Sequence, residues 1–345
     1  MKLIKGMLPE WAIQEAVMLA WPHESTDWRP WLQDIQRDYA ELAVAISTAA
    51  VPLILCQDEA HRKQILAMLD ARCVHAPRLV IVPYNDTWCR DYGPVSIRDG
   101  EQLQLLDFRF NGWGDKYDAS LDDAVNRQLT SLWQVPLISV DYELEGGSIE
   151  TDGNGSLLTT IHCLMESNRN TAFERQKVEA HVLGLLGLDR ALWLGEGGLS
   201  GDDTDSHIDN LVRFCSPDTI AYLACSRKED EHYESLSKME AQVLALRQAD
   251  GSPYRCQPIE MPTPHYDETG QRLPASYVNF LIVNDSVLVP VFACPEDARA
   301  LNDLASCFPG KKLIPVPGGN LIRQFGGPHC ATMQLPAGAL KWKAD

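Results

Sequence analysis

Five segments of this 345-residue chain repeat the same order of elements. In the first four, a polar residue precedes two short apolar stretches joined by a turn, and a helical stretch and a further apolar stretch follow. In the fifth, the polar residue precedes a single apolar stretch. The five polar positions are 91, 145, 207, 277 and 330, which lie 54, 62, 70 and 53 residues apart. Self-similarity of this kind indicates a repeat architecture in which one supersecondary unit recurs.

The two apolar stretches of each unit are predicted to pair as a hairpin, because turn-forming residues such as Asp99-Gly100 and Asn284-Asp285 separate them. The expected strands are 95–98 with 103–110, 148–151 with 156–160, 211–214 with 220–224, and 280–283 with 287–292. Apolar periodicity predicts helices between the hairpins, at 121–133, 172–186, 233–247 and 295–307.

The beginning of the chain supplies the part that the last unit lacks. Position 330 is followed by a single expected strand, 331–335, whereas residues 15–21 form a strand that has no hairpin partner nearby. Helix and strand then alternate as in α/β folds, at 28–50, 51–55, 61–71 and 79–83. Neither end carries the polar capping unit that an open solenoid needs, so we expect a closed ring in a single domain over residues 1–345. A two-domain α/β protein, in which the repeat is a coincidence, is the alternative.

A closed ring would bring Asp91, Glu145, His207, Asp209 and Cys330 into one central pocket. His207 and Asp209 are two residues apart, so on a strand both side chains would face the same way. Carboxylates accept paired hydrogen bonds from a planar guanidinium, and a thiolate beside it could attack the central carbon. An imidazole could protonate the departing ammonia and later activate water. The pattern predicts chemistry on a cationic guanidino group.

Each of these residues also has a purely structural explanation when taken alone. Asp91 could pair with Arg90, Glu145 could cap a turn, and Cys330 could be an ordinary buried thiol. The prediction of a site rests on the whole set, because all of the structural explanations would have to hold together.

The net charge of −18 and the isoelectric point near 4.9 argue against nucleic acid and against an anionic membrane as partners. They favour the approach of a small cation, although solubility alone would also account for such a charge. The ten cysteines form no CxxC pair, which argues against a zinc knuckle or a disulfide scaffold and is typical of a reduced, cytoplasmic protein. Lys2, Lys5, Glu10 and Glu15 interrupt the first apolar stretch, so a signal peptide is not expected.

At the same residues the sequence resembles the agmatine deiminases, a family grouped with bacterial peptidylarginine deiminases. The resemblance runs through nearly the whole chain in a fixed order. It is carried by LPEW at 8–11, LAWPH at 19–23, WCRDYGP at 88–94, FNGWGDKY at 110–117, LEGGS at 144–148, NRN at 168–170, GDDTDSHIDN at 201–210 and HC at 329–330.

The resemblance implies a pseudo-fivefold α/β propeller, the pentein fold, made of repeated ββαβ units around a central active site. It implies hydrolysis of agmatine to N-carbamoylputrescine and ammonia through a covalent thiouronium intermediate, as a step of putrescine and polyamine metabolism. No metal and no organic cofactor would be involved.

The same resemblance implies roles for individual residues. Cys330 would be the nucleophile, His207 the general acid and base, and Glu145 its carboxylate partner. Asp91 and Asp209 would hold the guanidinium nitrogens. Trp88 and Trp113 resemble aromatic wall residues of the pocket, although either would also suit the core.

Other functions fit the same residues. Free or peptidyl arginine would react by the same chemistry but would require donors for a carboxylate or a peptide. Asp203 and Asp205 near His207 favour the free ammonium of agmatine, although both would also suit a solvated loop. A polyamine-binding module would have no use for a thiol beside an imidazole, and an amidinotransferase would need a second pocket for its acceptor. Pro328 and the segment 316–325 depart from the family pattern, so the loop over the substrate tail is expected to differ. Monomer and homodimer both remain open.

Overall fold

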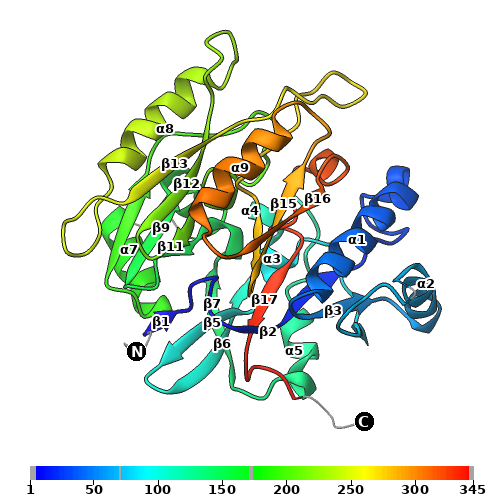
Figure 1. Ribbon diagram of the computed structural model, residues 1–345. Helices are drawn as coiled ribbons and strands as arrows, with labels where there is room; N and C mark the ends of the chain where they lie inside the picture. The colour runs from blue at the N-terminus through cyan, green and yellow to red at the C-terminus, as the bar shows by residue number, and fades with distance from the viewer. Residues whose placement is uncertain (1–4, 70, 171–173, 342–345) are drawn as a thin grey trace.

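Five separate sheets make up the framework of the computed structural model, which describes residues 5–69, 71–170 and 174–341 (Figure 1). Each sheet contains an antiparallel pair of strands, and one strand of that pair also has a parallel neighbour. A parallel connection needs a crossover, and in all five sheets the crossover segments contain helices or helical turns. The repeat seen in the sequence is therefore a repeat of sheets.

Four of the sheets follow one another along the chain. The first has the order β1 (Gly6–Met7), β5 (Val95–Asp99), β6 (Gln102–Arg109) and β7 (Leu137–Glu143). The second contains β8 (Glu150–Thr151), β9 (Ser156–Thr160) and β10 (Arg190–Leu194), and the third β11 (Val212–Ser216), β12 (Thr219–Ala224) and β13 (Arg255–Glu260). The fourth contains β14 (Leu281–Val283), β15 (Ser286–Val291) and β16 (Lys312–Pro317). All four predicted hairpins are confirmed to within about two residues at most strand ends.

The fifth sheet joins the two ends of the chain. Its order is β17 (Met333–Pro336), β2 (Gln14–Ala20), β3 (Val51–Cys56) and β4 (Arg78–Ile81). Strand β17 runs antiparallel to β2, with Met333 opposite Met18, which confirms that the N-terminal strand completes the last unit. The nearly continuous apolar sequences of β2 and β3 suit this position, since strands buried on both faces need no polar alternation.

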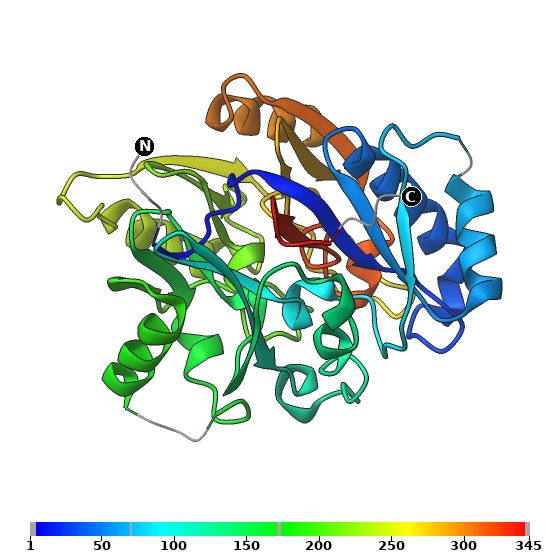
Figure 2. The same ribbon diagram turned by 90° about the horizontal axis from the view of Figure 1, so that it is seen from below.

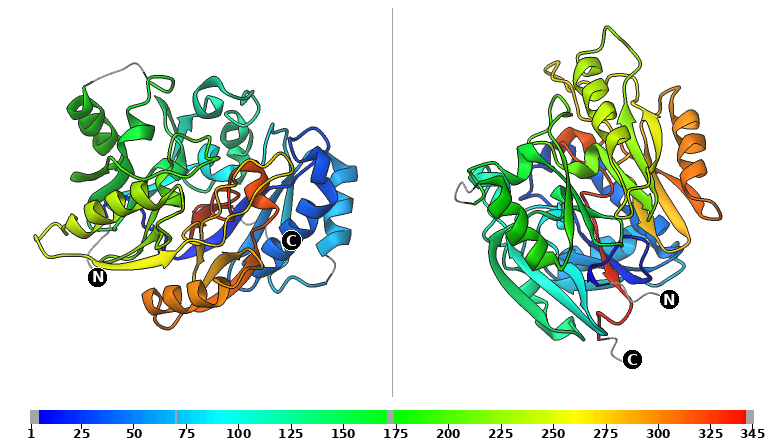
Figure 3. Two further views of the ribbon diagram at one scale, coloured as in Figure 1. Left: turned by 90° about the horizontal axis from the view of Figure 1, so that it is seen from above. Right: turned by 90° about the vertical axis from the view of Figure 1, so that its left-hand side faces the viewer.

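Long helices lie on the outside of the sheets, and the C-terminal segment lies near the middle of the molecule (Figures 2 and 3). The long helices are α1 (Leu32–Ser47), α2 (Glu59–Leu69), α7 (Arg175–Leu186), α8 (Tyr233–Ala245) and α9 (Asp297–Cys307). Helix α1 buries Ile35, Tyr39, Leu42 and Ile46, which recur at helical spacing on one face. The first residues of the predicted helix 172–186 and residue 70 in the predicted helix 61–71 lie outside the described residues.

The continuous helix predicted at 121–133 is wrong. Only α5 (Val125–Gln128) and the short 3-10 turn η2 (Thr130–Leu132) are formed there. Buried polar side chains tie this segment to other loops: Asp122 accepts the backbone N–H of Asn85, and Asn126 donates to the carbonyl of Tyr92. Such bonds hold the backbone in separate turns.

Short helical turns precede several of the hairpins. They are α3 (Cys89–Tyr92), η3 (Gly146–Ser148) and η4 (Ile208–Asn210). The remaining short turns are η1 (Arg29–Trp31), α4 (Gly112–Asp115), α6 (Ile161–Leu164) and η5 (Leu321–Gln324). The turn η3 packs against both α3 and η4, so polar residues at the starts of different hairpins meet. Among the residues described, no helix has both the length and the apolar character to cross a membrane.

Candidate active site

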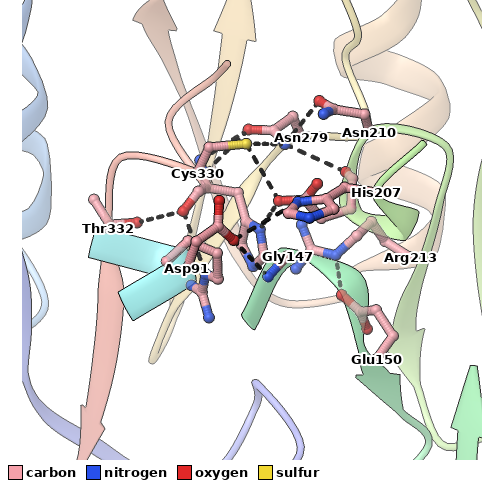
Figure 4. A network of polar contacts seen from close by, with 12 residues as sticks. Asp91, Gly147, Glu150, His207, Asn210, Arg213, Asn279, Cys330 and Thr332 are labelled. Atoms are coloured by element: carbon pink, nitrogen blue, oxygen red, sulfur yellow. Dashed lines mark hydrogen bonds and ion pairs between the residues drawn. The ribbon is translucent and has the colours of Figure 1, made fainter. Parts of the chain in front are cut away.

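The thiol of Cys330 lies in a turn just before β17, at the centre of a polar network (Figure 4). Asn279 Nδ2 donates to its sulfur at 3.1 Å, and the sulfur lies 3.3 Å from Oδ2 of Asp209. Burial, followed by the negative charges of Asp209 and Asp91, raises the pKa of Cys330 well above its usual range. The thiol therefore stays protonated in the empty pocket and donates a hydrogen bond to Asp209.

Asp209 is fully buried but has strong partners. Its Oδ2 also accepts a hydrogen bond from Nδ1 of His329 at 2.8 Å, while Oδ1 has no hydrogen-bond partner in the described part of the chain. Burial favours the neutral acid, but the hydrogen bond and charge of His329 outweigh it, so the pKa of Asp209 is lowered. An ionised carboxylate thus presents a free oxygen beside the thiol.

His207 is held between two carboxylates. Its Nδ1 lies 3.7 Å from Oδ1 of Asp91, and its Nε2 lies 3.7 Å from Oε2 of Glu145. Both separations exceed hydrogen-bond length, and neither ring nitrogen has a hydrogen-bond partner among the described residues. Burial favours the neutral ring, but Asp91, together with Cys163 and Glu145, raises the pKa of His207 well above its usual range.

The expectation that His207 and Asp209 share one face of a strand is wrong. His207 has an extended backbone and ends the loop before the 3-10 turn η4, and Asp209 is inside that turn. The change of backbone conformation between them still brings both to the site, because Asp209 turns towards Cys330 while His207 faces Glu145.

Glu145 is positioned by an arginine from another segment. Arg169 donates from Nε to Oε1 of Glu145 at 2.9 Å, and both side chains are almost fully buried. Burial raises the pKa of Glu145, but His207 and Arg169 outweigh it and bring it to about 2. This carboxylate is therefore a fixed negative charge that faces the imidazole.

Asp91 is the carboxylate with the opposite behaviour. It accepts hydrogen bonds from the backbone N–H of Gly147 and from Nε1 of Trp113, each at 2.9 Å. Burial, which is opposed by His207 but reinforced by Asp209 and Glu145, raises its pKa to about 6. Arg90 does not pair with Asp91 in this site; its guanidinium bonds instead to Gln334 and to the carbonyl of His329.

Gly147 allows these groups to approach one another. A Cβ at this position would lie 2.5 Å from Nδ1 of His207 and 2.8 Å from Oδ1 of Asp91, both far inside contact distance. Only glycine fits between the two side chains.

A pocket of about 390 Å³ leads from the surface to Cys330 and Asp91. Trp88, Trp113 and Asp203 all line it. The other lining residues belong to several loops and are Asp27, Asp86, Tyr117, Thr204, Gln324, Phe325 and Gly326. The segment that departs from the family pattern thus supplies part of the wall.

Besides Asp91, three further acids make this pocket attractive to a cation. Asp27, Asp86 and Asp203 line it, whereas none of its described lining residues is Lys or Arg. Burial raises the pKa of Asp86 to about 7 and also raises that of Asp203, which accepts a hydrogen bond from Tyr117 at 2.9 Å. An entering cation would favour the ionised form of both acids.

Sequence reasoning missed three residues of this site. Asn279 contacts the sulfur, His329 contacts Asp209, and Arg169 holds Glu145. A signal existed for each, because Asn279 is two residues from position 277, His329 precedes the cysteine, and Arg169 lies in the NRN segment. Tyr277 itself points elsewhere, with its hydroxyl bonded to Asp297.

The family model for Porphyromonas-type peptidyl-arginine deiminases matches residues 6–336. The chain belongs to this family. A solved structure provisionally assigned as a peptidyl-arginine deiminase is similar to it, with 41% identity, a TM-score of 0.92, and coverage of 97% of this chain and 99% of the other.

Other members of the peptidyl-arginine deiminase family are described as agmatine deiminases. The agmatine deiminase of Ectopseudomonas mendocina is 32% identical over 356 residues, which cover 96% of this chain and 95% of the relative. The structure of a Cys-to-Ser variant of C. jejuni agmatine deiminase with substrate bound is 34% identical, with a TM-score of 0.90 and 97% of each chain covered.

Proposed function

We propose that this chain hydrolyses agmatine to N-carbamoylputrescine and ammonia. The observation that carries the proposal is that Cys330 and Asp91 line one acidic pocket and that Asp209 contacts the sulfur of Cys330. The imidazole of His207 lies beside them, between the carboxylates of Asp91 and Glu145. Similarity to agmatine deiminases over nearly the whole chain supports the same reaction.

Binding comes first in the proposed mechanism. The guanidinium of the substrate donates hydrogen bonds to Asp91 and Asp209, whose carboxylates accept N–H groups in pairs. Its positive charge offsets the two negative charges that raise the pKa of Cys330, so the thiol releases its proton to solvent water as the substrate binds, while His207 keeps its own. The nucleophile is thus activated by its own substrate.

Chemistry then proceeds in two halves. The sulfur of Cys330 attacks the central guanidino carbon, and as the C–S bond forms His207 gives its proton to the leaving nitrogen, which departs as ammonia. The product of this half is a thiouronium adduct on Cys330. His207, now neutral, removes one proton from water as the water attacks the same carbon. The C–S bond then breaks, and the remaining hydroxyl proton of the adduct passes to the departing sulfur, which releases the carbamoyl product and restores the thiol. Glu145 and Asp91 stabilise the imidazolium in both halves.

The walls and the charge of the pocket determine which substrate tail binds best. The walls of Trp88 and Trp113 suit a four-carbon chain, and the acids Asp27, Asp86 and Asp203 suit a terminal ammonium. An α-carboxylate would meet these acids without a basic partner among the described lining residues. Deimination of free or peptidyl arginine is the second candidate, and the family description favours it.

We also propose that the five sheets close into a pseudo-fivefold α/β propeller that forms one domain over residues 1–345. The sharing of one sheet by β2 and β17 supports closure. The ten cysteines are all free thiols, which fits a reducing cytoplasm as the place of action.

Ammonia release with agmatine, arginine and a peptide that ends in arginine tests the proposed function. We expect the highest kcat/KM with agmatine. A higher kcat/KM with either arginine substrate would overturn the proposal that agmatine is the preferred substrate.

A further inference from the structure

Cys163 lies beside the catalytic groups but has no part in the proposed reaction. Its sulfur is 3.8 Å from Oε2 of Glu145, the same oxygen that lies 3.7 Å from Nε2 of His207. The three ligand atoms lie within 4.8 Å of one another, and all three residues are at least 97% buried. A thiol, an imidazole and a carboxylate therefore converge on one small space that is separate from the sulfur of Cys330.

These atoms have the chemistry and the spacing of a zinc site. Zinc binds sulfur at about 2.3 Å and imidazole nitrogen or carboxylate oxygen at about 2.0 to 2.2 Å in near-tetrahedral geometry. Two such ligands on one ion lie roughly 3.4 to 3.8 Å apart, which is close to the separations found here. We propose that Cys163, His207 and Glu145 form a latent site for Zn²⁺ and that occupation of this site turns the protein off.

The surroundings orient the ligands for this purpose. Arg169 holds Oε1 of Glu145, which leaves Oε2 directed towards Cys163 and His207. The ring nitrogens of His207 have no hydrogen-bond partner in the described residues, so a metal at Nε2 replaces the imidazolium proton but breaks no hydrogen bond of the ring. Asp91 lies next to Nδ1, as carboxylates commonly do behind a metal-bound histidine.

A second group of similar composition makes a useful contrast. Glu10, Glu150 and His329 also bring three ligand atoms within 4.8 Å of one another. There, however, the guanidinium of Arg213 already bonds to both glutamates, so a cation occupies the space between them. No arginine fills the space between Cys163 and Nε2 of His207 in the contacts of the described residues.

The inhibitory part of this proposal rests on the proposed function. Zinc at Nε2 would replace the proton that His207 carries and would also hold an oxygen of Glu145. Bound zinc would therefore remove the acid and base of the reaction and stop turnover. The binding part does not depend on turnover and can be tested without it.

The experiment uses the full chain with Cys330→Ala, which removes the proposed nucleophile as a metal ligand. Zinc binding is measured by calorimetry, and Co²⁺ is used as a spectroscopic probe for thiolate coordination. Second substitutions are Cys163→Ala and Cys163→Ser, with Cys225→Ser as the matched control because Cys225 is a buried thiol bonded to the carbonyl of Arg227. Melting without metal shows whether each variant is folded.

We expect one zinc ion per chain and a loss of affinity of about 100-fold when Cys163 is replaced, since even the removal of an outer-shell partner costs 10- to 100-fold. The thiolate-to-cobalt absorption should disappear when Cys163 is replaced and should remain in the Cys225→Ser control. A loss of less than tenfold in a folded Cys163 variant, or no zinc binding to the Cys330→Ala chain, would overturn the proposal. Either result would leave agmatine hydrolysis by the parent protein untouched, so the two ideas fail separately.

Discussion

The thiol of Cys330 donates to Oδ2 of Asp209 across 3.3 Å, so the nucleophile and an acid that would hold the substrate are in direct contact. In the empty pocket this carboxylate helps to keep the thiol protonated. Once a guanidinium binds to Asp209, its charge cancels that effect. The contact thereby couples substrate binding to thiolate formation and limits reaction with other electrophiles.

Replacement of Asp209 with Asn should separate its effect on the pKa of the Cys330 thiol from its role in substrate binding. The loss of a neighbouring negative charge lowers the pKa of Cys330, so the free protein should react faster with iodoacetamide at neutral pH. Agmatine binding should weaken by roughly 1.5 to 3 kcal/mol, the range for a hydrogen bond to a charged group. Asp203→Asn is the matched control, because Asp203 lines the pocket but is not among the groups that raise the pKa of Cys330. Slower alkylation of the Asp209 variant than of the control would contradict this account.

The binding of agmatine to the inactive Cys330→Ala protein should depend on pH through Asp91. The pKa of this acid rises from 3.8 to about 6 in the folded, empty pocket, yet the guanidinium needs the ionised form. At pH 5 a proton must be removed before binding, so we expect the affinity to be about tenfold lower than at pH 8. The melting temperature should therefore rise more with agmatine at pH 8 than at pH 5. Equal shifts at the two pH values, with no change in Asp91→Asn, would mean that the acids do not share one pocket.

The same pKa predicts how the empty protein responds to pH. Between about pH 4 and pH 6 the unfolded chain ionises Asp91 before the folded one does, so the free energy of unfolding contributed by this group falls as pH rises. The loss is about 1.4 kcal/mol per unit of pKa difference. Denaturant unfolding of the parent and of Asp91→Asn measures it, and the variant should lack this part of the decline.

Much of the fold followed from the spacing of turns and apolar stretches. The hairpins were predictable because period-two patterns and turn residues are local signals. The pairing of β2 with β17 followed from the repeat, since the last unit lacked a strand and the N-terminal strand lacked a hairpin partner. The helix at 121–133 was not, since Asp122 and Asn126 are tied to loops that lie far away in sequence. Local propensity carries no information about such partners.

In the site, too, some features could be predicted from sequence patterns and others depend on the folded backbone. Asp91, Glu145, His207, Asp209 and Cys330 were placed by the repeat and the family motifs. Tyr277 occupies the equivalent position in the fourth unit but faces Asp297, and Asn279 reaches the sulfur instead. The direction of a side chain within a tight turn depends on backbone dihedral angles that a sequence pattern does not contain. The geometry of η4 escaped prediction for the same reason.

Arg169 should act through Glu145, which it holds by a buried ion pair. Arg169→Met leaves that carboxylate without its cation, so we expect a loss of about 3 to 5 kcal/mol in the free energy of unfolding. The pKa of Glu145 should rise from about 2, which moves the acid limb of the kcat profile to higher pH while KM changes little. Arg169→Lys keeps the positive charge, so it should lose less stability and shift the pH profile of kcat less than Arg169→Met does. A variant with unchanged stability and an unchanged pH profile would show that the pair does not position Glu145.

Treatment with a chelator should not lower the rate of agmatine hydrolysis. The proposed reaction uses a thiol, an imidazole and carboxylates, and a metal at Cys163 would inhibit rather than assist. We expect the rate after chelation to equal or exceed the rate before it. If a chelator inactivated the protein and added metal restored the rate, the reaction would require a metal. That result would contradict both the metal-free mechanism and the proposed inhibition by metal at Cys163.

The most direct test of covalent catalysis compares ammonia release by ten single cysteine variants. Cys330→Ala should lose at least about 10⁴-fold in kcat, as removal of an attacking nucleophile does, while agmatine still binds. Each of the other nine substitutions, including the one at the buried Cys163, should retain turnover. More than a trace of ammonia release by a folded Cys330→Ala protein would contradict the central claim that this sulfur attacks the guanidino carbon.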